Sequence, residues 1–220
     1  MHVLFVCSGN VCRSAIAERL TRAYAAEHGI DTLTAESAGT RALVGFPIEP
    51  MAQRVIEGLG GDAADFKARK LKAEHIKNAD LILTMTEALR EDTMRLVPGI
   101  LHSTFTLLEA HRIATAVDAT SIGDLAVARH KLTPDDRENI SDPVGLSEAA
   151  FVAVGDRIAD ALLPLLTTLC PPAVADTSVP PRLPQRKPAG GNVIPFRRPE
   201  VRSGAPAYAT ASARMPWRSG

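Results

Sequence analysis

The stretch "VLFVCSGNVCRS" (Val3–Ser14) decides the fold. It joins an apolar run that ends at Cys7 to a short turn of small and polar residues, after which a helical pattern begins. A short continuous apolar run bounded by turn residues is typical of a buried strand in a parallel sheet. This strand is predicted to deliver the Cys7 side chain to the carboxyl edge of the sheet, where ligands bind in such folds.

Strand-like and helical patterns alternate through the first 170 residues, which predicts an α/β fold with a parallel sheet and helices on both faces. Strands are predicted over Val3–Cys7, Leu33–Ser37, Leu81–Met85 and Thr104–Leu108. Helices are predicted over Ala15–His28, Pro50–Leu59, Thr86–Leu96 and Ser147–Leu169. The weakly periodic segment Arg112–Ile140 holds one short helical pattern, Asp124–His130, and is interpreted as an insertion or a lid.

The composition changes abruptly after Cys170. Ten of the 16 prolines lie in the last fifty residues, where no apolar periodicity survives. This composition predicts one domain over residues 1–170 and a disordered Pro/Arg-rich tail over residues 171–220. Two tail segments, "PRLPQR" (Pro181–Arg186) and "NVIPFRRP" (Asn192–Pro199), are candidates for contact with a tail-binding protein, and the second is the better one.

The formal net charge of +0 hides an uneven distribution. Residues 170–220 carry eight Lys/Arg and two Asp/Glu, which leaves 17 basic and 23 acidic residues in the body. An acidic body disfavours a nucleic-acid partner.

No apolar stretch reaches membrane-spanning length, and the apolar run Val3–Cys7 is too short for the core of a signal peptide. Three cysteines do not form a disulfide framework. We therefore expect a cytoplasmic protein without a membrane partner. The six histidines show no metal-ligand spacing, so neither a metal nor another cofactor is expected.

The segment Cys7–Ser14, here called the thiol loop, has the chemistry of an anion site. Ser8, Gly9 and Asn10 tolerate left-handed backbone, so successive N–H groups can converge on one anion. A helix that starts near Ser14 adds free N–H groups and a positive dipole end. Such a site suits a phosphate, and it also favours the thiolate form of Cys7, which is then a nucleophile.

Arg13 closes the thiol loop with a planar guanidinium fork that matches two phosphate oxygens. The spacing C-x5-R alone is common by chance. The full combination of strand, Cys-x-Gly-Asn-x-Cys-Arg-Ser and helix is specific. The residues predicted to bind the phosphate are Ser8, Gly9, Asn10, Val11, Cys12, Arg13 and Ser14.

These residues closely resemble the low-molecular-weight protein tyrosine phosphatase family. The resemblance rests on "VCSGNVCRSAIAE" (6–18), "ESAGT" (36–40), "ADLILTMT" (79–86) and "SDPVG" (141–145). It implies a four-stranded parallel sheet with a phosphate-binding loop after the first strand. It also implies hydrolysis of phosphorylated protein through a phosphocysteine. Cys7 is then the nucleophile, Arg13 the phosphate clamp, Asn10 the residue that holds the loop's left-handed turn, and Ser14 a hydrogen-bond donor to the sulfur.

Asp142 is the candidate general acid, because the departing oxygen needs a proton and the family keeps its acid at this Asp-Pro. Pro143 restricts the backbone of the residue before it and stiffens the loop. Asp135 and Asp136 are distant competitors. Aromatic residues usually follow this Asp-Pro in tyrosine phosphatases, whereas this chain has "VG", so Phe46 is the candidate wall for a phenyl ring.

Three other functions compete with a tyrosine phosphatase. A protein-arginine phosphatase shares the fold and a "DPxG" loop, but has a threonine where this chain has Val11. An arsenate reductase needs a further cysteine near residue 80, and none lies between Arg13 and Leu169. The third is a non-catalytic phosphate-binding or scaffolding protein. Within the loop, Cys12 is interpreted as a resolving thiol that captures oxidised Cys7.

Overall fold

The computed structural model of the chain describes residues 1–131 and 138–172. Asp135, Asp136 and both tail segments lie outside the described residues. Within those residues, no helix combines the length and apolar character that crossing a membrane requires.

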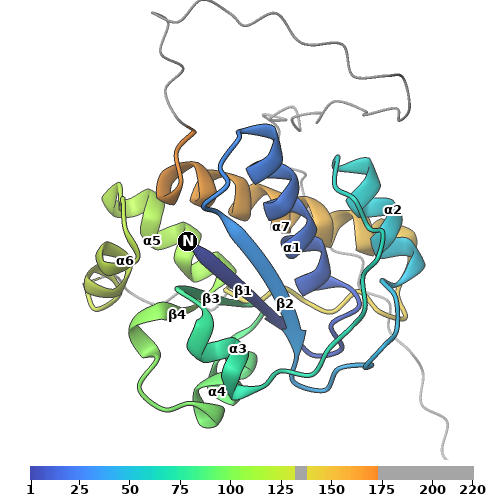
Figure 1. The fold of residues 1–220 in the computed structure, drawn as a ribbon, viewed down its shortest axis with the longest axis horizontal. Helices are drawn as coiled ribbons and strands as arrows, with labels where there is room; N and C mark the ends of the chain where they lie inside the picture. Colours follow the sequence, from blue (N-terminus) through green and yellow to red (C-terminus); the bar gives the residue numbers. More distant parts are fainter. Residues whose placement is uncertain (132–137, 173–220) are drawn as a thin grey trace, which may run out of the picture.

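The sheet of the described residues has four parallel strands in the order β2-β1-β3-β4, as predicted (Figure 1). The strands are β1 (His2–Cys7), β2 (Thr34–Gly39), β3 (Leu81–Thr84) and β4 (Thr104–Thr106). The central strand β1 pairs with β2 as far as Cys7, which lies opposite Gly39. The carboxyl end of β1 therefore has a neighbouring strand on each side.

Helices cover both faces of the sheet, which confirms the expected architecture (Figure 1). They are α1 (Arg13–Glu27), α2 (Pro50–Gly58), α3 (Ala73–Asn78), α4 (Glu87–Leu96), α5 (Leu107–Val117), α6 (Ile122–Arg129) and α7 (Glu148–Leu169), with a 3-10 turn η1 (Leu101–Ser103). Successive side chains of a strand point to opposite faces. Val3 and Phe5 accordingly join the core under α1, α2, α5 and α7. Leu4 and Val6 join a smaller core with Ile76 of α3.

The predicted strand Thr104–Leu108 is wrong in its last two residues, because α5 begins at Leu107. The Thr106 side chain accepts a hydrogen bond from the Glu109 backbone N–H (3.0 Å), and the Glu109 carboxylate accepts one from the Thr106 N–H (3.2 Å). This reciprocal capping box starts a helix. The apolar pair after Thr106 extended the strand pattern and hid the T-x-x-E signal. The short helix α3 also has no counterpart among the predicted elements.

The interpretation of Arg112–Ile140 as a lid is wrong for its described part up to residue 131. Ile113 of α5 and Leu125 of α6 are fully buried in the main core. The buried Glu109 carboxylate pairs with Arg90 (2.6 Å) and with Arg129 (2.9 Å), which ties α4 and α6 to α5. These helices are therefore integral to the fold.

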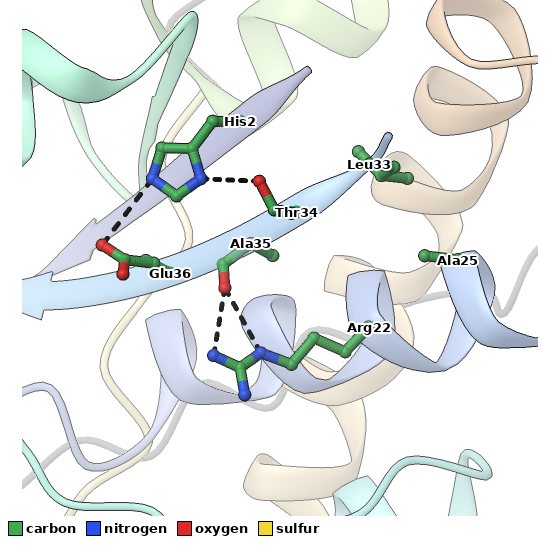
Figure 2. Close-up of a pocket in the computed structure, with 7 residues that line it drawn as sticks. All are labelled: His2, Arg22, Ala25, Leu33, Thr34, Ala35 and Glu36. Carbon is green, nitrogen blue, oxygen red and sulfur yellow. Dashed lines mark hydrogen bonds and ion pairs between the residues drawn. The ribbon is translucent and has the colours of Figure 1, made fainter. Parts of the chain in front are cut away.

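The outer edge of β2 is closed by side chains (Figure 2). Arg22 of α1 donates from Nε and Nη2 to the Ala35 carbonyl, each at 3.2 Å. His2 is hydrogen-bonded to Thr34 (2.8 Å) and lies 3.6 Å from the Glu36 carboxylate. The donors of Arg22 satisfy an edge carbonyl that would otherwise invite another strand. Figure 2 shows that the polar side chains around the hollow already bond to one another or to the β2 backbone, whereas Ala25 and Leu33 line it with apolar surface.

We expect Gly39→Ala to disrupt the fold at the carboxyl end of β1. A Cβ at this position would lie 2.4 Å from the Ser8 carbonyl oxygen, so backbone would have to move. The free energy of unfolding should fall by about 3 kcal/mol, as measured by urea denaturation. Gly58→Ala is the control, because its Cβ would meet nothing within 4 Å at the end of α2 and alanine favours helix. Equal stability of the two variants would contradict this account.

Candidate active site

The thiol loop lies between the end of β1 and the start of α1, at the carboxyl edge of the sheet. Cys7 is the last residue of β1, and Arg13 is the first residue of α1. Cys7 is buried, with 2% of its surface exposed. The strand–turn–helix arrangement predicted from the sequence is therefore present, with the helix starting one residue before Ser14.

The side chain of Asn10 organises the thiol loop. Asn10 is fully buried and has left-handed backbone, with φ of 56°. Its Oδ1 accepts a hydrogen bond from the Arg69 backbone N–H at 2.8 Å. Its Nδ2 donates to Ser14 Oγ (3.0 Å) and to Ser37 Oγ (2.8 Å). A backbone N–H can only donate, so the amide has one orientation.

This orientation decides where the neighbouring hydroxyl hydrogens point. Ser14 Oγ accepts from Asn10 and lies 2.9 Å from Cys7 Sγ, to which it donates its own hydrogen when Cys7 is a thiolate. Likewise Ser37 Oγ accepts from Asn10 and donates to the Glu18 carboxylate at 2.5 Å. The Asn10 backbone N–H also donates to Cys7 Sγ at 3.2 Å. Two donors therefore face the sulfur and stabilise negative charge on it.

Arg13 brings the thiol loop into contact with the Asp-Pro segment far along the chain. Arg13 is 5% exposed. Its Nη1 donates to the Ile140 carbonyl at 2.9 Å, and its Nη2 forms an ion pair with the Asp142 carboxylate. Its buried Nε has no hydrogen-bond partner among the described residues. The Asp142 side chain is 46% exposed, so the carboxylate reaches solvent beside the loop.

Three contacts anchor the segment that carries Asp142, and the sequence reasoning missed all three. The Ile140 N–H donates to the Met85 carbonyl at 2.8 Å, just after β3. Asn139 Oδ1 accepts from the Glu87 N–H at 2.8 Å, at the start of α4. The nearly buried Glu138 pairs with Arg112 of α5 at 2.5 Å. The only sign of these contacts in the sequence was that two polar residues, Glu138 and Asn139, directly precede the apolar Ile140.

Cys12 and Val11 are both buried in the thiol loop. Burial raises the pKa of the Cys12 thiol, and the charges of Cys7 and Asp142 raise it further. Cys12 is therefore held in its neutral thiol form, and its role as a resolving cysteine stays a prediction. Val11 is 8% exposed and belongs to the main core, so most of its surface packs inward.

A second loop, residues 40–49, lies alongside the thiol loop and is joined to it by backbone hydrogen bonds. The N–H groups of Thr40, Arg41 and Leu43 donate to the carbonyls of the first three thiol-loop residues at 2.9–3.0 Å. The aromatic ring of Phe46 is in this loop and is 59% exposed. On the acid side, Val144 is 53% exposed. Apolar side chains thus stand exposed on the two segments that flank the thiol loop.

Among residues 1–131 and 138–172, no group of three or more His, Cys, Asp and Glu side chains is arranged to hold a metal ion. The polar groups that converge on Cys7 are instead hydrogen-bond donors and one guanidinium. Such a set can bind an oxyanion and support attack by a sulfur nucleophile.

Comparison of the sequence with known proteins finds low molecular weight protein-tyrosine-phosphatases. Residues 2–124 match the family model described as low molecular weight phosphotyrosine protein phosphatase. The chain is 36% identical over 106 residues to the low molecular weight protein-tyrosine-phosphatase Ptp of Acinetobacter johnsonii, covering 48% of this chain and 71% of that protein. It is 33% identical over 114 residues to the probable enzyme EpsP of Ralstonia nicotianae, covering 52% and 75%.

Solved structures agree with these sequence relatives. The low molecular weight protein tyrosine phosphatase of T. tengcongensis superimposes with a TM-score of 0.62 at 28% identity, over 77% of this chain and 99% of that one. The tyrosine phosphatase AmsI of Erwinia amylovora gives 0.59 at 27%, over 77% and 93%. The YwlE arginine phosphatase of Geobacillus stearothermophilus gives 0.57 at 26%, over 73% and 87%.

We expect Asn139→Ala to loosen the Asp142 segment. The change removes the acceptor for the Glu87 N–H, one of the free donors at the start of α4. The free energy of unfolding should fall by about 1 kcal/mol, and the Ile140 amide should exchange faster with deuterium. Asn78→Ala is the matched control, since this exposed asparagine ends α3 and makes no side-chain hydrogen bond within the described residues. Unchanged exchange at Ile140 would contradict the anchoring role.

Proposed function

The chain belongs to the low molecular weight phosphotyrosine protein phosphatase family, and from this we propose that it hydrolyses phosphotyrosine in proteins, with Cys7 as nucleophile, Arg13 as phosphate clamp and Asp142 as general acid. The remaining thiol-loop residues bind the phosphate through their backbone N–H groups. Phosphorylated protein as substrate follows from the family, and tyrosine from the relatives named above.

The contact between Arg13 and Asp142 supports this assignment most directly. It joins two parts of the proposed chemistry, a phosphate-binding fork and a carboxyl group, beside a sulfur that already has two hydrogen-bond donors. Nucleophile, clamp and acid need this proximity, because all three act on one phosphorus atom and its leaving oxygen.

The proposed reaction has two steps. The Cys7 thiolate attacks phosphorus, the bond to the tyrosyl oxygen breaks, and Asp142 gives that oxygen its proton. In the second step, Asp142 as carboxylate takes a proton from water, and the water oxygen attacks the phosphocysteine. The S–P bond breaks, which releases inorganic phosphate and restores the thiolate. Ser14 assists both steps, because its hydrogen bond stabilises the sulfur as it attacks and as it leaves.

Arg13 has to exchange partners when phosphate arrives. Two of its nitrogens are engaged by Ile140 and Asp142, and the buried Nε is unpartnered. Phosphate oxygens would replace the Asp142 carboxylate on the guanidinium, since a dianion competes well for the bidentate fork. The released Asp142 carboxylate then takes up a proton from solvent and, as the acid, serves the leaving oxygen.

A leaving-group series tests the roles of Cys7 and Asp142. Cys7→Ser should lower turnover at least about a thousandfold, because an unactivated hydroxyl cannot replace the thiolate. Asp142→Asn should slow hydrolysis of substrates with poor leaving groups about a hundredfold or more, and that of activated aryl phosphates by less than about tenfold. Asp31→Asn, at an exposed turn before β2, is the control. Residual turnover by Cys7→Ser, or equal losses across the series for Asp142→Asn, would contradict the assignment and would favour a binding role.

Val11 tests the choice between phosphotyrosine and phosphoarginine. Phosphoarginine is the alternative that the "DPVG" segment and the YwlE relative favour. Its rigid β-branched side chain offers a guanidinium no polar partner. We expect higher kcat/KM on phosphotyrosine than on phosphoarginine peptides, and Val11→Thr should shift the ratio toward phosphoarginine by roughly tenfold. Val11→Ile, which adds no hydroxyl, is the control. A preference of the unmodified protein for phosphoarginine would reverse this ranking.

A further inference from the structure

Three exposed cations beside the thiol loop have no acidic partner. Ion pairs hold most arginines and lysines of the described residues, even exposed ones such as Arg54 with Glu148 (3.5 Å) and Lys72 with Glu74 (3.4 Å). In contrast, no carboxylate of residues 1–131 or 138–172 pairs with Arg41, Lys67 or Lys70. We call these three residues the basic rim.

Backbone hydrogen bonds fix the basic rim next to the thiol loop. The Arg41 N–H donates to the Ser8 carbonyl at 2.9 Å. The connection from α2 to α3 carries Lys67 and Lys70, and it passes the carboxyl end of β2 (Figure 1). Between these lysines, the Arg69 N–H donates to Asn10 Oδ1 at 2.8 Å. Both segments of the rim therefore touch the loop that holds the nucleophile.

The charge of the basic rim is opposite to that of the body around it. Residues 1–169 carry 17 basic and 23 acidic residues, so the formal charge of the body is negative. A local cationic patch on such a body attracts an acidic segment to one place and orients it. Because this patch lies beside the thiol loop, the acidic segment that it attracts should belong to the protein substrate itself.

We propose that the basic rim docks acidic residues that flank the phosphotyrosine of the protein substrate. This inference rests on the function proposed above and adds a substrate preference to it. An extended peptide spans about 10 Å in three residues, so residues near the phosphotyrosine reach beyond the thiol loop. Aspartate and glutamate there meet Arg41, Lys67 and Lys70, whereas lysine or arginine is repelled. Because the rim is exposed, its contribution is modest for each charge and sensitive to salt.

Phosphotyrosine peptides of equal length test the docking surface. Their flanks carry Asp/Glu, Asn/Gln or Lys/Arg, and kcat/KM is measured at low and high ionic strength beside p-nitrophenyl phosphate. The unmodified protein should prefer acidic over basic flanks by about tenfold at low salt, and less at high salt. Lys67→Glu and Lys70→Glu should each lower kcat/KM on the acidic peptide about threefold, and leave p-nitrophenyl phosphate hydrolysis within about twofold.

Lys77→Glu is the matched control for each charge reversal. Lys77 is also exposed and without an ion-pair partner in the described residues, but it lies on α3, which leads to the amino end of β3. An equal loss in this variant would show a general charge effect and overturn the docking surface. So would equal rates on the three peptides from a protein that hydrolyses p-nitrophenyl phosphate. A protein that hydrolyses neither p-nitrophenyl phosphate nor any peptide would overturn the proposed function itself.

Discussion

The three hydrogen bonds of the Asn10 amide are the interaction on which the site depends. They connect the thiol loop to the start of α1 through Ser14, to β2 through Ser37, and to the α2–α3 connection through Arg69. They also leave the Ser37 hydroxyl hydrogen for the Glu18 carboxylate and the Ser14 hydroxyl hydrogen available to the Cys7 sulfur. An aspartate could not replace Asn10, because a carboxylate has no hydrogens to donate to the two serines. The amide thus serves packing and sulfur chemistry together.

The features that lie close together in the sequence were predicted well. The first strand, the turn and the first helix are contiguous between Val3 and His28, so apolar periodicity and turn residues suffice to predict them. The start of α5 was missed although its capping box is just as local, because two leucines after Thr106 also continue a strand pattern. Tertiary packing, and not propensity, makes α6 part of the core.

The features that depend on long-range contacts were not predictable from residue patterns. Asp142 lies 129 positions from Arg13, and only the family resemblance pointed to it. Nothing in the spacing indicated that Glu138 would pair with Arg112, or that Asn139 would cap α4 from the far side of the sheet edge. These partners meet because β3, α4 and α5 bring their ends to the same edge. That proximity is a property of the topology, and a short segment of sequence does not reveal it.

The ion pair between Arg13 and Asp142 links the two demands of the proposed reaction. A phosphate clamp must be a buried, preorganised cation, and an unpaired buried cation is costly. Asp142 offsets that cost while the site holds no phosphate, and the Ile140 carbonyl keeps one arm of the guanidinium in place throughout. In the proposed reaction the arriving phosphate takes over the neutralising role, and the released Asp142 carboxylate takes up a proton from solvent before it protonates the leaving oxygen. In this proposal the same residue stabilises the empty loop and acts in the loaded one, and the contacts that anchor segment 138–142 hold it beside the clamp.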